Sequence, residues 1–189
     1  SNVHPDFPEG GVMSQKIDKL EKGDSFSFRG PNGRLEYMGD GVFNIKQLKS
    51  QGGEIIEKKV KNVGMIAGGT GITPMIQIIR AVLRNENDPT KLSLLFANKE
   101  ERDIILRDKL ENPDRDFSDR FEVHYTLDKA EDGWSGFTGF IDKEMIRNTM
   151  PEPSDDTLIL LCGPPKMNSE AVKPALESIG YSPDSIFNF

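Results

Sequence analysis

Two loops of small residues, each lying between an apolar run and a helical pattern, constrain the fold of this chain most. Residues 64–74 read GMIAGGTGITP, and residues 160–167 read LLCGPPKM. Each segment predicts a buried strand that runs into a loop and then a helix. This arrangement brings backbone N–H groups and a helix N-terminus to a place where a phosphate-bearing ligand can bind. Two such loops in one chain predict a cleft for a dinucleotide.

The second part of the chain alternates apolar strands with amphipathic helices. Thr73 and Pro74 suit the start of one helix, in which apolar residues recur at i, i+3, i+4, i+7 and i+8. Such alternation predicts an α/β fold with a parallel sheet covered on both faces. Strands are predicted at 63–67, 92–97, 121–126, 157–162 and 185–189, and helices from 74, at 103–110, at 143–149 and from 166.

The loops that follow these strands are predicted to share one edge of the sheet, because ligands on parallel sheets bind beyond the carboxyl ends of the strands. The loops in question are 68–73, 98–101, 127–129 and 163–166. In the helix from residue 166, Pro174 is expected to cause a kink or an interruption.

The first part of the chain has a different pattern. Residues 25–29 and 34–38 flank Gly30-Pro31-Asn32-Gly33 and predict paired strands. A short helix is predicted before them, with Ser14 as its cap and Gly23 as its end. Residues 50–62 are polar and charged and predict a loop or linker.

Composition excludes several classes of function. The net charge of −7 argues against nucleic acid as the main partner, because phosphate binding needs a basic face. A single cysteine allows no intrachain disulfide, which is typical of a reducing compartment, and no Cys/His spacing indicates a metal site. No apolar run approaches the length of a membrane span, and the first residues do not form a signal peptide.

The first glycine loop matches neither common phosphate-binding motif. Gly69 and Gly71 fit the first two positions of G-x-G-x-x-G, but Pro74 occupies the third, and no Gly-Lys-Ser/Thr follows. Its glycines would let the backbone approach a flat ligand closely, and Thr70 and Thr73 offer hydroxyl groups. The alternative is a tight turn with glycines for packing alone, although one glycine would suffice for that.

Two further residues have two interpretations each. Cys162 would need a histidine base to act as a nucleophile, and neither His4 nor His124 is obviously placed for that; a small buried residue is the alternative. Asp128 could accept from a ribose hydroxyl and repel a ribose phosphate, or it could be a carboxylate in solvent.

These segments together resemble the ferredoxin-NADP reductase-like flavoproteins, in particular the NADH–cytochrome b5 reductases. The resemblance extends over essentially the whole chain. The segments that carry it are 4–15, 28–33, 64–75, 125–128, 162–167 and 187–189.

The resemblance implies FAD and NADH as cofactors. Hydride would pass from NADH to FAD, and single electrons would then pass to a haem protein such as cytochrome b5. It also implies a place on the cytosolic side of the endoplasmic reticulum or mitochondrial outer membrane, through an anchor outside these residues. The alternatives are an FAD/NADH module of a larger reductase such as nitrate reductase, and a nucleotide-binding fragment without activity of its own.

Site residues follow from the resemblance position by position. Val12, Met13 and Ser14 would contact the FAD pyrophosphate, and Thr73 would reach the flavin side of the cleft. Asp128 would favour NADH over NADPH, and Cys162 would orient the nicotinamide without acting as a nucleophile. The residues implied for NADH are Gly69, Thr70 and Gly71 at the pyrophosphate and nicotinamide, Phe96 and Asp128 at the adenosine half, and Cys162, Gly163, Pro164 and Met167 at the nicotinamide.

The chain departs from the family pattern in two places. Val12 stands where related reductases often carry lysine, and the flavin-binding motif Arg-x-Tyr-Ser/Thr is absent. We therefore expect a partial antiparallel flavin-binding barrel whose first strands are missing. The expected domains are the C-terminal part of the FAD-binding barrel at 1–50, a linker at 51–62 and the NADH-binding domain at 63–189.

Overall fold

The computed structural model describes residues 8, 10–30, 32–111 and 119–189 and forms two units, Ser1–Gly33 and Arg34–Phe189. The smaller unit contains one helix, α1 (Val12–Asp18), among its described residues. Within the segment expected to contact the flavin pyrophosphate, residues 4–7 and 9 lie outside the described residues, as does Pro31 of the expected turn.

The larger unit is built on a six-stranded sheet, and each neighbouring pair of its strands is parallel. The strand order is β7-β6-β5-β4-β8-β9, so the chain moves outward on one side of β4 and then returns to the other side. The predicted parallel α/β fold is confirmed. The strands are β4 (Asn62–Gly68), β5 (Lys91–Asn98), β6 (Phe121–Leu127), β7 (Phe137–Thr138), β8 (Thr157–Cys162) and β9 (Ile186–Asn188).

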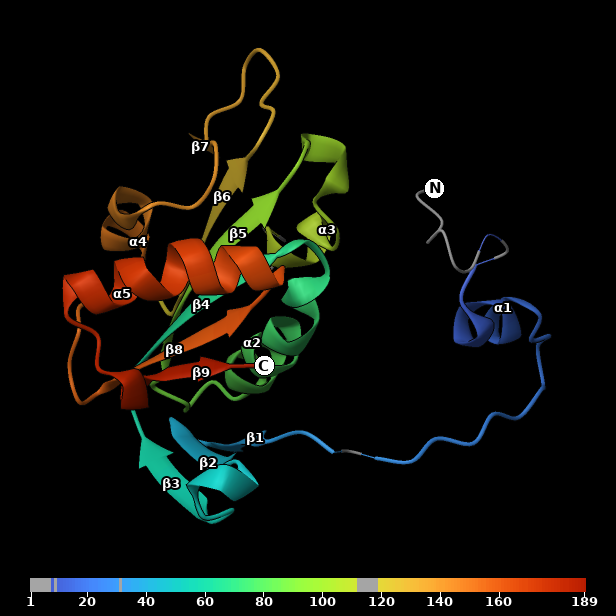
Figure 1. The fold of residues 1–189 in the computed structure, drawn as a ribbon, viewed down its shortest axis with the longest axis horizontal. Helices are drawn as coiled ribbons and strands as arrows, with labels where there is room; N and C mark the ends of the chain where they lie inside the picture. Colours follow the sequence, from blue (N-terminus) through green and yellow to red (C-terminus); the bar gives the residue numbers. More distant parts are fainter. Residues whose placement is uncertain (1–7, 9, 31, 112–118) are drawn as a thin grey trace. The chain divides into compact units, whose positions relative to one another are not determined.

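Helices cover both faces of this sheet. Successive side chains of a strand point to opposite faces, so neighbouring residues of one strand pack against different helices. In β4, Met65 packs into one apolar cluster together with α2 (Ile72–Arg84). The next residue, Ile66, packs into a second cluster with α4 (Lys143–Thr149) and α5 (Lys173–Ile179). Figure 1 shows α5 in front of the strands. The apolar stripe predicted for α2 is buried, as expected.

Two helices begin earlier than predicted. A 3₁₀ turn, η2 (Gly69–Gly71), leads directly into α2, so Gly71 is the N-cap and Thr73 lies in the first turn. The Thr73 hydroxyl donates to the carbonyl of Thr70 at 3.1 Å, so the partner of this hydroxyl lies in the preceding turn. In α1 the N-cap is Gly11, and Ser14 is therefore a helical residue.

One other helix is interrupted, and another changes its helix type along its length. The helix predicted at 103–110 is divided into η3 (Glu101–Asp103) and α3 (Arg107–Leu110), because Leu106 adopts the left-handed conformation between them. Before α5 the chain forms a π-helical segment, Met167–Val172, and Pro174 then occupies the first turn of α5. Pro174 follows a change from π-helical to α-helical geometry, but the backbone stays helical from residue 165 to residue 179, so the expected interruption is not seen.

A small antiparallel sheet precedes the parallel one and corrects two predictions. It consists of β1 (Leu35–Gly39), β2 (Val42–Lys46) and β3 (Ile55–Lys59). Residues 25–29 form no strand, because β1 takes β2 as its partner through a turn in which Gly39, Asp40 and Gly41 all have positive φ.

The prediction of a loop over residues 50–62 is also wrong, because part of this segment forms β3. The strand follows a short 3₁₀ turn, η1 (Lys49–Gln51). Backbone pairing to β2 holds this polar segment in a strand although its side chains are largely exposed. The functional division of the chain at residues 50 and 62 stays a prediction.

A buried hydrogen-bond network joins β1 to the segment after α2. The Tyr37 hydroxyl donates to the carboxylate of Asp88, which also accepts from the backbone N–H groups of Thr90 at 3.0 Å and Asp40 at 3.2 Å. Burial, together with the hydrogen bond to Asp88, raises the pKa of Tyr37 to about 12. The network ties the small sheet to the parallel sheet within the larger unit.

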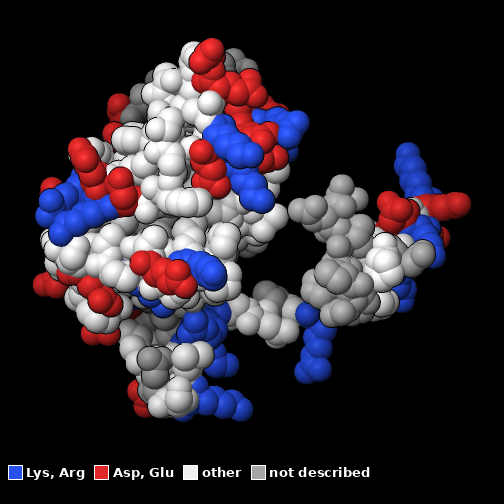
Figure 2. Space-filling model, turned by 45° about the horizontal axis from the view of Figure 1, so that its top comes forward, with Lys and Arg blue, Asp and Glu red and all other residues white. Residues whose placement is uncertain are grey.

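The visible surface in Figure 2 carries Lys and Arg side chains interspersed with Asp and Glu side chains. None of the helices in the described part of the chain has the length and apolar character needed to cross a bilayer. Among these described residues, no group of three or more His, Cys, Asp and Glu side chains is placed to hold a metal ion.

Candidate nucleotide-binding site

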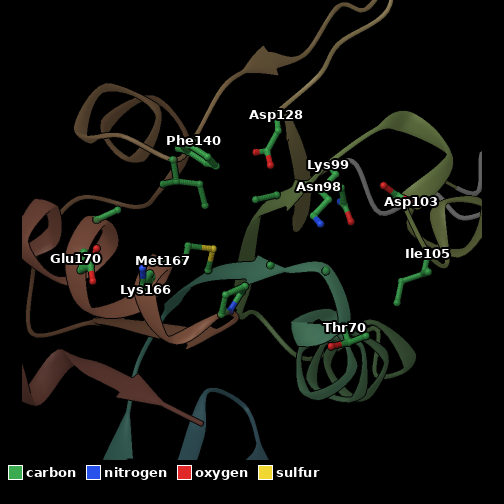
Figure 3. Close-up of a pocket in the computed structure, with 16 residues that line it drawn as sticks. Thr70, Asn98, Lys99, Asp103, Ile105, Asp128, Phe140, Lys166, Met167 and Glu170 are labelled. Carbon is green, nitrogen blue, oxygen red and sulfur yellow. The ribbon is translucent and has the colours of Figure 1, made fainter. Parts of the chain in front are cut away.

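A cavity of about 680 Å³ lies at the carboxyl ends of β4, β5, β6 and β8 (Figure 3). The order in which the chain adds strands to the sheet reverses between β4 and β8, and crevices at such points are where parallel sheets bind ligands. Four strand-end loops contribute to the lining, as predicted. The lining residues are Gly68, Gly69, Thr70, Ala97, Asn98, Lys99, Asp103, Ile105, Asp128, Phe140, Ile141, Pro164, Lys166, Met167, Glu170 and Ala171.

The two glycine loops are packed directly against each other. A Cβ atom on Gly71 would overlap the carbonyl oxygen of Cys162, and one on Gly68 would lie 2.8 Å from Cδ of Pro164. A Cβ on Gly163 would lie 3.1 Å from the backbone nitrogen of Gly68. Three of the glycines are therefore needed for the close approach of the loops.

Gly69 has a different role. Its φ of +53° is in the left-handed region, and a Cβ atom there would meet no atom of the described residues within 4 Å. It lines the cavity together with the exposed Thr70. Both interpretations of the loop therefore apply, each to different glycines: Gly68 and Gly71 pack, while Gly69 presents backbone to the cavity.

The structure brings five of the residues predicted for NADH to the cavity wall: Gly69, Thr70, Asp128, Pro164 and Met167. Gly71, Cys162 and Gly163 lie immediately behind this wall, in the loop contact described above. The Asp128 carboxylate points toward the cavity in Figure 3. The roles expected for these residues stay predictions.

The structure corrects the prediction that the Phe96 side chain contacts NADH. Its side chain is 0% exposed and lies 6.2 Å from the Tyr125 ring, measured between ring centroids, in the core between the sheet and α2. The side chain cannot contact an adenosine from that position. The next residues along β5, Ala97 and Asn98, line the cavity instead.

Cys162 is partly buried at the end of β8. Burial raises the pKa of its thiol, which favours the protonated form and disfavours a nucleophilic thiolate. His124 lies within β6, where its Nε2 is 3.6 Å from the Glu122 carboxylate, and it does not line the cavity. His4 lies outside the described residues. This environment favours a positioning or packing role for the cysteine.

Among the cavity residues that were not singled out from the sequence, two have unusual surroundings. Phe140 is 79% exposed although it is a large aromatic side chain, and it faces the cavity from the segment before α4. Asn98 is only 6% exposed, and neither its Nδ2 nor its Oδ1 has a hydrogen-bond partner among the described residues. Asn98 directly follows the strand predicted at 92–97, which was a usable signal, whereas no sequence period marks Phe140.

The chemistry of the cavity suits a nucleotide. Lys99 and Lys166 offer positive charge, Asp128 offers an acceptor, and Phe140 offers an aromatic face. Backbone of the left-handed Gly69 is accessible beside Thr70. Adenine, ribose and pyrophosphate need these kinds of groups.

The residues predicted for FAD lie elsewhere in the chain. Val12, Met13 and Ser14 belong to α1 of the smaller unit, and their side chains are exposed. The Thr73 side chain is also exposed, although its hydroxyl donates within its own turn. Contact of these residues with FAD stays a prediction.

Comparison with known proteins agrees with this geometry. A model of the oxidoreductase NAD-binding domain matches residues 65–173, and a model of the oxidoreductase FAD-binding domain matches residues 3–37. NADH-cytochrome b5 reductase 3 of Rattus norvegicus is 50% identical over 188 residues, which cover 100% of this chain. The chain belongs to the NADH-cytochrome b5 reductase family.

Other members of the family give the same result. NADH-cytochrome b5 reductase 1 of Homo sapiens is 50% identical over 187 residues. The cytochrome b5 reductase domain of Ulva prolifera nitrate reductase superposes with a TM-score of 0.87 at 40% identity, covering 100% of this chain and 70% of that one. The chain spans 62% of the rat reductase and 61% of the human one.

Proposed function

We propose that this chain is the NADH-binding part of a flavoprotein reductase that transfers a hydride from NADH to FAD and then passes single electrons to a haem protein such as cytochrome b5. The observation that carries the proposal is the cavity at the carboxyl ends of β4, β5, β6 and β8, with Gly69, Asp128 and Phe140 on its wall. The family matches support both cofactors. When bound, the flavin supplies the hydride acceptor and the capacity to release electrons one at a time.

The residues of this chain would bind and orient NADH. Backbone N–H groups at Gly69 and Thr70 would meet the pyrophosphate at the start of α2. Pro164 and Met167 would hold the nicotinamide against the loop contact and exclude water from it. The partly buried, protonated Cys162 would orient the ring from behind, and the hydride step would need no acid or base from the protein.

The adenosine half would lie toward β6. The Asp128 carboxylate would accept from ribose hydroxyls and repel a 2′-phosphate, which favours NADH over NADPH. The exposed ring of Phe140 would supply an aromatic face for the adenine. At the other cofactor, Val12, Met13, Ser14 and Thr73 would contact FAD.

A spectrum of the purified chain tests this proposal. A yellow protein that is bleached by NADH supports the reductase. A colourless protein that binds NADH supports a nucleotide-binding fragment without activity of its own. If the chain binds neither FAD nor NADH at millimolar concentration, the proposed site is wrong.

A second candidate is the FAD/NADH module of a larger reductase such as nitrate reductase, which the 0.87 TM-score to the Ulva prolifera domain favours. The sequence encoded before Ser1 distinguishes the two candidates. A haem domain there supports the larger reductase. A membrane anchor there supports a cytochrome b5 reductase tethered on the cytosolic side of the endoplasmic reticulum or the mitochondrial outer membrane.

A further inference from the structure

We infer that Asn98 reads the ribose hydroxyls of the bound dinucleotide, as a specificity residue beside Asp128. The inference rests on the proposed function, because it concerns a group within the proposed NADH site. It adds a neutral side chain, placed at the end of the neighbouring strand, to the single carboxylate expected from the sequence.

Asn98 is buried but unpaired. Its residue exposure is 6%, and both polar atoms of its amide lack a hydrogen-bond partner among the described residues. Buried side-chain polar atoms are mostly hydrogen-bonded, since leaving them unpaired is costly. Thr126 and Thr149 follow the rule: their hydroxyls donate to Gly139 and Met145 carbonyls, each at 2.7 Å.

The amide lies directly beneath the cavity surface. Asn98 lines the cavity, although the two polar atoms of its amide have almost no accessible area of their own. Its backbone is fixed at the last ladder position of β5, opposite Leu127, and its carbonyl accepts from the N–H of Asp128 at 3.0 Å. A rigid strand end therefore holds the unpaired amide against the cavity wall, where a rotation of the side chain would bring it to a bound ligand.

The groups around Asn98 limit the chemistry of its partner. Asp128 and Asp103 line the same cavity as Lys99 and Lys166, so the lining carries charges of both signs and does not favour an anion by charge alone. An amide offers both a donor and an acceptor, which an anion could use only in part. A ribose diol both donates and accepts, so it can donate to Asp128 and exchange hydrogen bonds with Asn98.

The unaltered chain provides the first test, with NADH and its analogues that lack the 2′- or the 3′-hydroxyl of the adenosine ribose. We expect at least one analogue to bind about 10-fold more weakly than NADH, measured as a dissociation constant by calorimetry. This readout does not depend on hydride transfer or on FAD. Equal affinity for all three ligands would overturn the inference.

The second test uses Asn98→Leu, which keeps the side-chain volume and removes both polar atoms. We expect ADP-ribose to bind this variant about 10-fold more weakly, and the preference of NADH over its deoxy analogues to shrink, with Asp128 retaining the remainder. Asn87→Leu is the matched control, since Asn87 is exposed and does not line the cavity. Thermal unfolding of each variant shows whether it is folded.

The outcomes separate the two levels of inference. If the unaltered chain binds neither NADH nor ADP-ribose, the proposed function fails and this inference fails with it. If the chain binds both ligands and Asn98→Leu binds them as tightly as the unaltered chain does, only the inference about Asn98 fails. If the variant loses affinity for every ligand by the same factor, Asn98 shapes the cavity and does not read the ribose, which also contradicts the inference.

Discussion

Gly71 lies so close to the backbone carbonyl of Cys162 that a Cβ atom at position 71 would overlap the carbonyl oxygen. This contact joins the start of α2 to the end of β8, and both segments border the cavity. The two glycine loops thus form one wall because they pack against each other. The shape of the site depends on a residue that does not itself line it.

Replacing Gly71 by alanine should destabilise the larger unit. The new Cβ can be accommodated only if the backbone at Cys162 moves, and such overpacking typically costs about 1–3 kcal/mol. Denaturant unfolding measures the loss. Gly30→Ala is the control, because its Cβ would meet only ordinary contact, at 3.7 Å from the Asn32 nitrogen. Equal stability of the two variants would show that the loops are not tightly packed.

Replacing Asp128 by asparagine should relax the choice between NADH and NADPH. The carboxylate lines the cavity and would repel a 2′-phosphate, so its loss should tighten NADPH binding about 10-fold relative to NADH. Dissociation constants for both nucleotides measure the ratio. The exposed Asp132→Asn serves as the control for a change of net charge. A ratio that stays constant would place the ribose away from Asp128.

Truncation of Phe140 to alanine should weaken NADH binding while leaving stability nearly unchanged. The side chain is 79% exposed, so its removal leaves no cavity in the core, whereas a lost aromatic contact with adenine weakens binding about 3- to 10-fold. Fluorescence titration with NADH and thermal unfolding measure the two effects. Phe28→Ala, at an 81% exposed aromatic residue, is the control. Unchanged affinity would exclude Phe140 from the adenine site.

Asp88 should make stability depend on pH in the acid range. Burial opposes its charge, but hydrogen bonds from Thr90 and Tyr37 outweigh this and lower the pKa of Asp88 below its ordinary value. A carboxyl with a depressed pKa stabilises the fold above its ordinary pKa of about 4, and this stabilisation is lost as pH falls through the lower folded value.

Asp88→Asn should therefore unfold more easily at pH 7, by about 1–3 kcal/mol, and should lose less stability on acidification. Urea unfolding between about pH 3 and 7 measures how the free energy of unfolding depends on pH in Asp88→Asn and in the unaltered chain. Asp132→Asn again controls for charge alone. Parallel pH curves for Asp88→Asn and the unaltered chain would show that Asp88 does not titrate as the hydrogen bonds indicate.

The larger part of the fold could be predicted from periodicity. Alternating apolar strands and helices predicted the parallel sheet, and the position of each loop after a strand predicted a common edge, because parallel strands end on the same side. The strand β2, the turn that joins it to β1, and β3 were missed. In β3, backbone hydrogen bonds to a partner strand outweigh a polar composition, and a single segment does not reveal its partner.

The site was predicted in outline and decided in detail by packing. Sequence alone determined which loops would meet, since it shows which loops follow a strand, and loops that follow parallel strands share one edge of the sheet. Only the tertiary structure showed that Phe96 is core, that Asn98 is buried without a hydrogen-bond partner among the described residues, and that Phe140 is exposed at the cavity. The physical reason is that strands buried on both faces carry apolar residues at every position, so the direction and exposure of a side chain depend on the neighbouring elements.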